Sequence, residues 1–119
     1  MNTSAEDATQ SAIVDHFRAI GTDEVAASAI YSDDAVLEFV QSRERIVGKA
    51  NIIAAREAYP GRPVTFEVVR VAGSGDIWFA ELILRFGGVE PHYVAAVIDV
   101  EDGRILRERI YIAEPWEAP

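Results

Sequence analysis

Glu81, His92 and Glu108 are the residues whose types and positions could support acid–base chemistry. Glu108 alternates with aliphatic residues in the last apolar segment, so a strand there would place a carboxylate on its most apolar face. Apolar surroundings raise the pKa of a carboxylate, and an unperturbed histidine titrates near pH ~6.5. These residues could therefore exchange protons near neutral pH if the fold brings them into one pocket.

The elements that would position these residues divide into helices first and strands last. A capping pattern at Thr3 and Ser4 and a stop at Gly21 frame the first helix, and Thr22 could cap the second. Glycine-containing turns separate the later segments, which are rich in β-branched and aromatic residues. The helices are expected at about 5–20, 22–32 and 49–59, and the strands at 35–40, 45–47, 64–72, 77–86, 92–100 and 105–112. This order predicts a single α+β domain over residues 1–119, with a curved antiparallel or mixed sheet and helices on one face.

The direction of Glu108 depends on the turn at residues 101–103. A three-residue loop places Ala96 opposite Glu108, whereas a two-residue Asp-Gly turn places Val97 there. We favour the longer loop because it joins the apolar faces of the last two strands.

The strand at 77–86 is apolar on both faces, which is unusual for a sheet covered by helices on one side only. One face carries large side chains that suggest a partner surface. We expect a homodimer through this outer sheet face, formed by Trp78, Leu82, Leu84 and Phe86.

Composition excludes several classes of partner. With 20 acidic and 11 basic residues, the net charge of −9 argues against binding to nucleic acid or anionic membranes. The polar amino terminus does not resemble a signal peptide, and no segment matches the ~20 apolar residues of a membrane span. We therefore expect a cytoplasmic protein. The chain has no cysteine, its two histidines lie far apart, and Gly73-Ser74-Gly75 is no phosphate loop, so no metal or cofactor is expected.

Several local sequences carry a family resemblance. They are Tyr31-Ser32-Asp33-Asp34-Ala35 before the first strand, Gly48 before the third helix, Asp102-Gly103-Arg104-Ile105, and Tyr111 with Glu114-Pro115. Together with the order of elements, they resemble the SnoaL-like family of the nuclear-transport-factor-2-like superfamily over essentially the whole chain. The resemblance implies a cone-shaped sheet around three helices with an apolar pocket. The superfamily includes ketosteroid isomerases, polyketide cyclases, epoxide hydrolases, dehydratases and members without known chemistry, so the fold alone does not give the reaction.

The catalytic positions of these relatives carry apolar residues in this chain. By resemblance, the isomerase tyrosine falls at Phe17, its general-base aspartate at Phe39 and its second acid near Ala96. The aspartate of limonene-epoxide hydrolase falls near Ile110. Neither catalytic constellation is therefore present.

The same resemblance defines an expected pocket, in which Arg56 takes the place of an isomerase tyrosine. Glu81 and Glu108 would point into it from strands about 10 Å apart, and their repulsion would separate their pKa values into an acid and a base. Alternatively, Arg56, Arg85 or tyrosine hydroxyls hold these acids in a polar cluster that shapes the pocket. The other expected pocket residues are Phe17, Phe39, Phe79, Ile83, Val94, Ala96, Ile98, Ile110 and Ile112.

The two histidines have different expected places. His92 would face the pocket mouth, as a third acid–base candidate or as a solvated rim residue, and His16 is expected at the surface or against a loop. Three functions remain open: a domain that binds a hydrophobic small molecule, a cofactor-independent acid–base enzyme acting on a hydrophobic carbonyl or polycyclic compound, and a pure dimerisation module. We favour the first, because the relatives' catalytic positions are apolar here.

Overall fold

The structure is a computed structural model, and it describes residues 3–58, 64–87 and 90–118. In these residues, helices α1 (Thr3–Ala19), α2 (Glu24–Ser28) and α3 (Lys49–Glu57) accompany six strands. The strands are β1 (Tyr31–Phe39), β2 (Glu44–Val47), β3 (Val64–Ser74), β4 (Ile77–Phe86), β5 (His92–Glu101) and β6 (Arg104–Ala113). No helix in the described ranges is long and apolar enough to cross a membrane.

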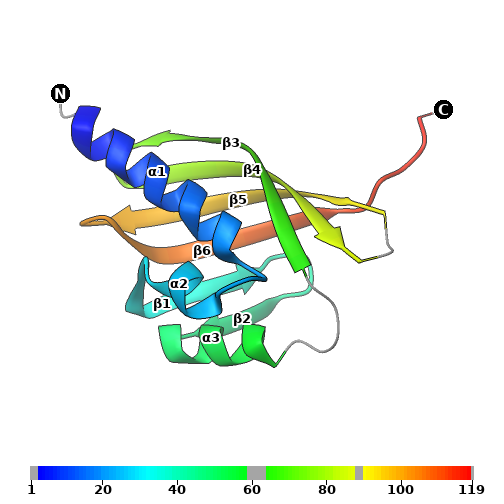
Figure 1. Cartoon of the computed structure of the whole chain (residues 1–119), viewed down its shortest axis with the longest axis horizontal. Coiled ribbons are helices and arrows are strands. Elements are labelled where there is room, and N and C mark those ends of the chain that lie inside the picture. The colour runs from blue at the N-terminus through cyan, green and yellow to red at the C-terminus, as the bar shows by residue number, and fades with distance from the viewer. Residues whose placement is uncertain (1–2, 59–63, 88–89, 119) are drawn as a thin grey trace.

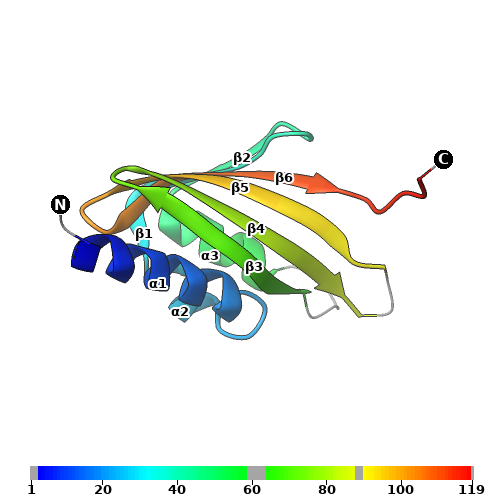
Figure 2. The ribbon, with the colours of Figure 1, turned by 90° about the horizontal axis from the view of Figure 1, so that it is seen from above.

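The six strands form one mixed sheet in the order β2-β1-β6-β5-β4-β3. Strands β3 to β6 make the predicted antiparallel meander, and β1 joins β6 in parallel. The sheet curves, and the helices lie on one of its faces (Figures 1 and 2). The predicted α+β fold is therefore confirmed.

The helix boundaries follow from local hydrogen bonds. Asp23, rather than Thr22, caps α2, because its carboxylate accepts a hydrogen bond of 3.0 Å from the backbone N–H of Ala26. Thr22 instead donates its hydroxyl to the carbonyl of Ala19 at the end of α1. Between the two helices, Gly21 has a φ of +89°, which a side chain would strain.

The hairpin between β5 and β6 has a two-residue turn, not the expected three-residue loop. Asp102 and Gly103 take positive φ angles of 51° and 75°, the geometry of a tight hairpin. The pairing then shifts by one residue, because β6 holds an extra residue, Leu106, between its pairs with Val100 and Asp99. This bulge restores the inward face of β6: Glu108 lies opposite Ile98, whereas we expected Ala96 there.

Strand β4 faces opposite to the expected direction. Its Ala80 pairs with Ala96 of β5, so its even-numbered residues share the inner face of the sheet. Glu81, Phe79 and Ile83 therefore point outward, away from the helices. Sequence alternation could not decide this, because β4 is apolar on both faces and a long connection separates it from β5.

The predicted dimer surface is consequently part of the core. Trp78, Leu82 and Leu84 are at most 5% exposed and pack under the helices with α1 residues such as Phe17. The side chain of Phe86 lies outside the described residues. The outer face instead carries Ile77, Phe79, Tyr93 and Tyr111, which are 41–51% exposed.

Candidate functional site

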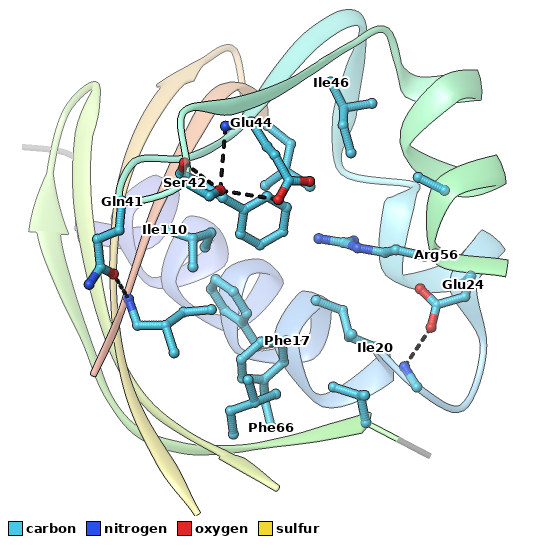
Figure 3. A pocket seen from close by; sticks show the side chains of 17 residues that line it. Phe17, Ile20, Glu24, Gln41, Ser42, Glu44, Ile46, Arg56, Phe66 and Ile110 are labelled. Atoms are coloured by element: carbon cyan, nitrogen blue, oxygen red, sulfur yellow. Dashed lines mark hydrogen bonds between the residues drawn. The ribbon is translucent and has the colours of Figure 1, made fainter. Parts of the chain in front are cut away.

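A pocket of about 710 Å³ lies between the helices and the curved sheet (Figure 3). All three described helices and five strands contribute to its wall, which is mostly apolar. The apolar side chains are Phe17, Ile20, Leu37, Phe39, Ile46, Ala55, Val64, Phe66, Leu84, Ile110 and Ile112, and the polar ones are Glu24, Gln41, Ser42, Glu44 and Arg56. A pocket of this size and character suits a small hydrophobic molecule.

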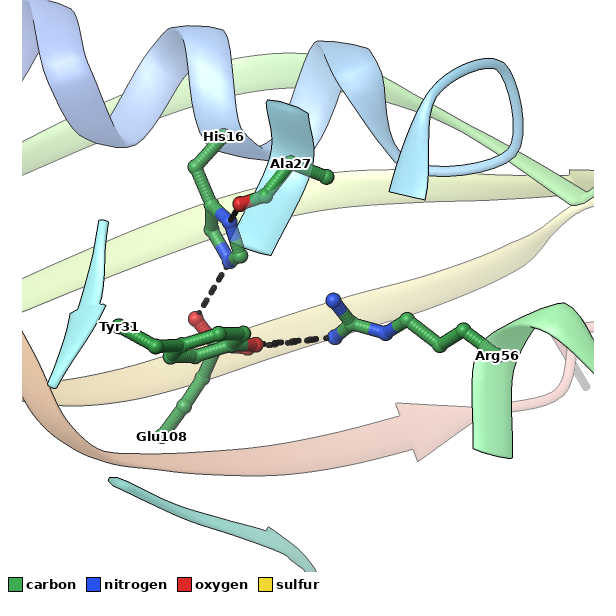
Figure 4. Close-up of polar contacts among 5 residues, drawn as sticks. All are labelled: His16, Ala27, Tyr31, Arg56 and Glu108. Carbon is green, nitrogen blue, oxygen red and sulfur yellow. Dashed lines mark hydrogen bonds and ion pairs between the residues drawn. The ribbon is translucent and has the colours of Figure 1, made fainter. Parts of the chain in front are cut away.

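Glu108 lies beneath this pocket and does not line it. Its side chain is fully buried, and both carboxylate oxygens are engaged (Figure 4). Oε2 lies 2.8 Å from Nε2 of His16, and Oε1 accepts a 2.7 Å hydrogen bond from the hydroxyl of Tyr31. The guanidinium of Arg56 lies 3.6 Å from Oε1. We call these four residues the Glu108 cluster.

The protonation of His16 follows from its two hydrogen bonds. Its Nδ1 lies 2.5 Å from the carbonyl oxygen of Ala27, which can only accept, so Nδ1 carries a proton. Its other ring nitrogen, Nε2, faces the carboxylate of Glu108, which is an acceptor. The cluster thus holds a buried ion pair between α1 and β6.

Charge and hydrogen bonding keep Glu108 ionised despite its burial. Burial alone would raise the pKa of Glu108, but the charge and hydrogen bond of His16, with help from Arg56 and Tyr31, outweigh it and hold the pKa below its ordinary value. Burial, followed by the charge of Glu108, raises the pKa of Tyr31 well above its ordinary value. Tyr31 is therefore a neutral phenol that donates to the carboxylate.

Arg56 connects the Glu108 cluster to the pocket. Its Nη2 donates to the Tyr31 hydroxyl at 3.0 Å, and its guanidinium lies over the Tyr31 ring, 5.6 Å from the centroid. Burial opposes the charge of Arg56, but interactions with Tyr31 and Glu108 outweigh burial and raise its pKa. Arg56 is thus a permanent cation with one nitrogen on the cluster and the rest of its head at the pocket wall.

Four elements supply the Glu108 cluster. His16 and Phe17 are neighbours on α1, with one side chain in the cluster and the next on the pocket wall. Tyr31 begins β1, which runs parallel to β6. Arg56 lies in the last turn of α3, and the bulge in β6 directs Glu108 inward.

Two polar atoms at the pocket lack protein partners. The Nη1 atom of Arg56 and the Oε2 atom of Glu24 are both buried, and neither has a hydrogen-bond partner among the described residues. The other carboxylate oxygen of Glu24, Oε1, accepts a 2.6 Å hydrogen bond from the backbone N–H of Gly21. The pocket therefore offers one buried donor and one buried acceptor.

The expected site residues are distributed between the pocket, the core and the outer surface. Phe17, Phe39, Arg56, Ile110 and Ile112 line the pocket. Val94, Ala96 and Ile98 are buried in the core of the sheet and do not line it. Phe79 and Ile83 point to the outer face, which corrects their expected placement in the pocket.

The expected pair of carboxylates does not form. Glu81 is exposed on the outer face, because the pairing of β4 with β5 reverses its direction, so it cannot interact with Glu108 across the interior. His92 is half-buried at the start of β5, with Nδ1 3.1 Å from the carbonyl of Glu90, and it does not line the pocket. Glu108 matches the alternative of a polar cluster, held by Arg56 and a tyrosine hydroxyl.

Sequence reasoning missed two residues of this region. His16 was expected at the surface or against a loop, yet it completes a stripe with Ile13, Phe17 and Ile20 at spacings of three and four, which signals a buried helix face. Glu24 gave no comparable signal, because its role depends on contacts between distant segments. In the described parts of the chain, no group of three or more His, Cys, Asp or Glu side chains could hold a metal ion.

The fold and the pocket define a class of small α+β proteins with a ligand-sized cavity between a curved sheet and its helices. Residues 11–108 match the SnoaL-like domain family, and this chain belongs to that family. Among curated proteins, no sequence matches the chain.

Solved structures place the chain within the wider superfamily. An NTF2-like protein of unknown function from Burkholderia xenovorans LB400 is 36% identical, with a TM-score of 0.87 over 96% of this chain and 89% of that one. An LEH-like epoxide hydrolase of M. tuberculosis is 28% identical, with a TM-score of 0.74 over 89% of this chain and 83% of that one. The epoxide hydrolase/cyclase-like enzyme SalBIII, which functions in pyran ring formation in salinomycin, is 16% identical, with a TM-score of 0.76 over 91% and 92%, and shares the fold alone.

Proposed function

We propose that this protein binds a hydrophobic small molecule in the pocket and holds the ligand's polar group at Arg56. The observation that carries this proposal is the apolar cavity of about 710 Å³ with a buried, unpartnered guanidinium nitrogen at its wall. Apolar walls supply binding energy by removing ligand surface from water, and a single charged donor orients the ligand.

The Glu108 cluster stabilises the charge of Arg56 at the pocket wall. A lone guanidinium in an apolar pocket would be costly, but the carboxylate of Glu108 compensates its charge from below. Tyr31 fixes the position of Nη2, and Nη1 keeps no hydrogen-bond partner among the described residues. The buried carboxylate thus supports ligand binding without touching the ligand.

Pocket occupancy can be tested with prodan, a neutral naphthyl ketone whose fluorescence shifts to the blue in apolar surroundings. Ile46→Trp would fill part of the pocket, and Val47→Trp places the same indole at the neighbouring exposed position. We expect Ile46→Trp to weaken prodan binding at least about tenfold and Val47→Trp to leave it unchanged, since tenfold corresponds to only ~1.4 kcal/mol. Equal affinities of the two variants, or no binding to the wild type, would contradict the proposal.

One observation favours acid–base catalysis as a second candidate function. The chain of contacts from His16 through Glu108 and Tyr31 holds the cation of Arg56 on the pocket wall, where the carboxylate of Glu24 also lies. Arg56 could stabilise the oxygen of an enolate, and the carboxylate of Glu24 could accept the α-proton of a bound carbonyl compound. Deuterium exchange into the methyl group of acetylnaphthalene, followed by NMR, tests this. Exchange no faster than in buffer would count against it.

We also propose that the protein forms a homodimer through the outer face of the sheet. Exposed Phe79, Tyr93 and Tyr111 lie there beside both acidic and basic side chains, so two copies could pair apolar and charged groups. Light scattering should show a dimer for the wild type and for Val47→Glu, and a monomer for Phe79→Glu. A monomeric wild type at micromolar concentration would contradict this.

We further propose a cytoplasmic location, which the net charge of −9 supports.

A further inference from the structure

The pocket contains an unpaired donor and an unpaired acceptor of opposite charge. Nη1 of Arg56 is the donor and Oε2 of Glu24 is the acceptor, and both are buried without a hydrogen-bond partner in the described part of the chain. Both residues line the pocket, and their side chains enter it from the same side (Figure 3). The charge of Glu24 helps to raise the pKa of Arg56, but no hydrogen bond or close ion pair joins the two side chains.

Such atoms impose a requirement on a ligand. Buried polar groups in native proteins are almost always hydrogen-bonded, and leaving one unmade costs about 1–3 kcal/mol. A purely apolar ligand would leave both atoms unsatisfied. A ligand that gains affinity here must therefore accept from Arg56 and donate to Glu24.

The charges of the two residues also decide the charge of the ligand group. An ionised carboxylate would pair with Arg56 but would bring its negative charge against Oε2 of Glu24. A ketone would accept from Arg56 but would leave Glu24 without a donor. A carboxamide presents a carbonyl oxygen and an N–H side by side and is neutral, so it satisfies both atoms.

We infer that Arg56 and Glu24 form a recognition subsite for a neutral amide-type group, a carboxamide or lactam, on a hydrophobic ligand. This inference rests on the proposed binding function and narrows its ligand class. Glu24 is the residue that determines specificity, because Arg56 alone would favour a carboxylate. The hydrogen bond from Gly21 to Oε1 holds the carboxylate of Glu24 at the pocket wall and leaves Oε2 without a partner among the described residues.

Three probes of nearly equal shape test this subsite. Naphthamide, naphthoate and acetylnaphthalene, substituted at the same ring position, present an amide, a carboxylate and a methyl ketone. We expect calorimetry on the wild-type protein to show naphthamide binding at least about tenfold more tightly than either of the others, the size of effect expected from one unmade hydrogen bond.

The second part of the experiment repeats the comparison of the three probes on the Glu24→Gln variant. The Gly21 N–H selects the amide oxygen of the new side chain, so its NH₂ group replaces Oε2 at the pocket. A donor then stands where the acceptor stood, and the preference should change to naphthoate. Glu44→Gln removes the same charge from the pocket rim, where Glu44 bonds to Ser42, and should leave the order of the probes unchanged.

The outcomes separate this inference from the proposed function. If the wild type binds all three probes equally, the subsite is wrong and the binding function stands. If none of the probes binds, both are wrong. If Glu24→Gln and Glu44→Gln change the order equally, net charge and not the subsite governs the preference, which also overturns the inference. The wild-type comparison keeps the test available if Glu24→Gln does not fold.

Discussion

The Nε2 atom of His16 lies 2.8 Å from Oε2 of Glu108, and neither side chain is exposed to solvent. These residues are 92 positions apart in sequence, on the first helix and the last strand. Their contact therefore links the two ends of the fold directly beneath the pocket. Because both charges are buried, each depends on the other for compensation.

Removing the carboxylate should destabilise the protein strongly. Glu108→Ala leaves the His16 and Arg56 charges without their buried counter-ion, and breaking such a pair typically costs about 3–5 kcal/mol. Glu81→Ala is the matched control, because Glu81 is exposed on the same sheet, and it should stay within about 0.5 kcal/mol of the wild type. Urea denaturation measures both values. Similar midpoints for the two variants would show that the buried pair contributes little.

The same carboxylate should make stability depend on pH in the acid range. The pKa of Glu108 in the folded state is below its ordinary value of 4.5, so the folded protein resists protonation at this site. The resulting stability is fully present above about pH 4.5 and is lost as the pH falls through the lower folded-state pKa. Denaturant midpoints measured from pH 7 downward should fall more steeply for the wild type than for Glu108→Gln. Parallel curves would contradict this.

Tyr31→Phe should weaken the Glu108 cluster without creating a cavity. The substitution removes only the hydroxyl that donates to Glu108 and accepts from Arg56, and a hydrogen bond to a charged group contributes about 1.5–3 kcal/mol. Tyr111→Phe, at an exposed position, should be nearly neutral. The difference in the free energy of unfolding between the two variants measures the contribution, and a difference close to zero would contradict it.

Gly21→Ala should be far more damaging than Gly103→Ala, although both glycines have a positive φ. An added Cβ at Gly21 would lie 1.7 Å from the backbone oxygen of Val64, whereas at Gly103 it would meet nothing within 4 Å. Gly103→Ala should therefore show only the left-handed penalty of about 1–2 kcal/mol. Thermal unfolding measures the stability that each variant loses. Equal losses would show that the positive φ angle, and not the contact with Val64, causes the destabilisation.

The fold and the inward direction of Glu108 could be predicted because they depend on local patterns. Glycine turns delimit the strands, and the aliphatic residues around Glu108 mark one face of β6. The direction of β4 could not be predicted, because residues of similar hydrophobicity occupy both faces and the connection to β5 is too long for turn rules. Only the pairing of Ala80 with Ala96 decides it.

The Glu108 cluster could be predicted only in part from the sequence. A lone histidine on an apolar helix stripe has no nearby acid in sequence to mark it as an ion-pair partner, and His16 meets Glu108 only through the packing of α1 on the sheet. Glu24 illustrates the same limit, because its importance comes from an oxygen that stays unpaired after every local hydrogen bond is made.

The extra residue in β6 implies a competition between two alignments of the last hairpin. With the same turn and no bulge, Glu108 would lie opposite Val97 on the outer face, and Arg107 and Arg109 would turn into the core. Burying two guanidinium groups costs more than the bulge, so the two arginines protect the hairpin against misalignment during folding. A shorter β6 lacking Leu106 would need no bulge and would still set Glu108 against Ile98, so chain length can change here while the interior stays the same.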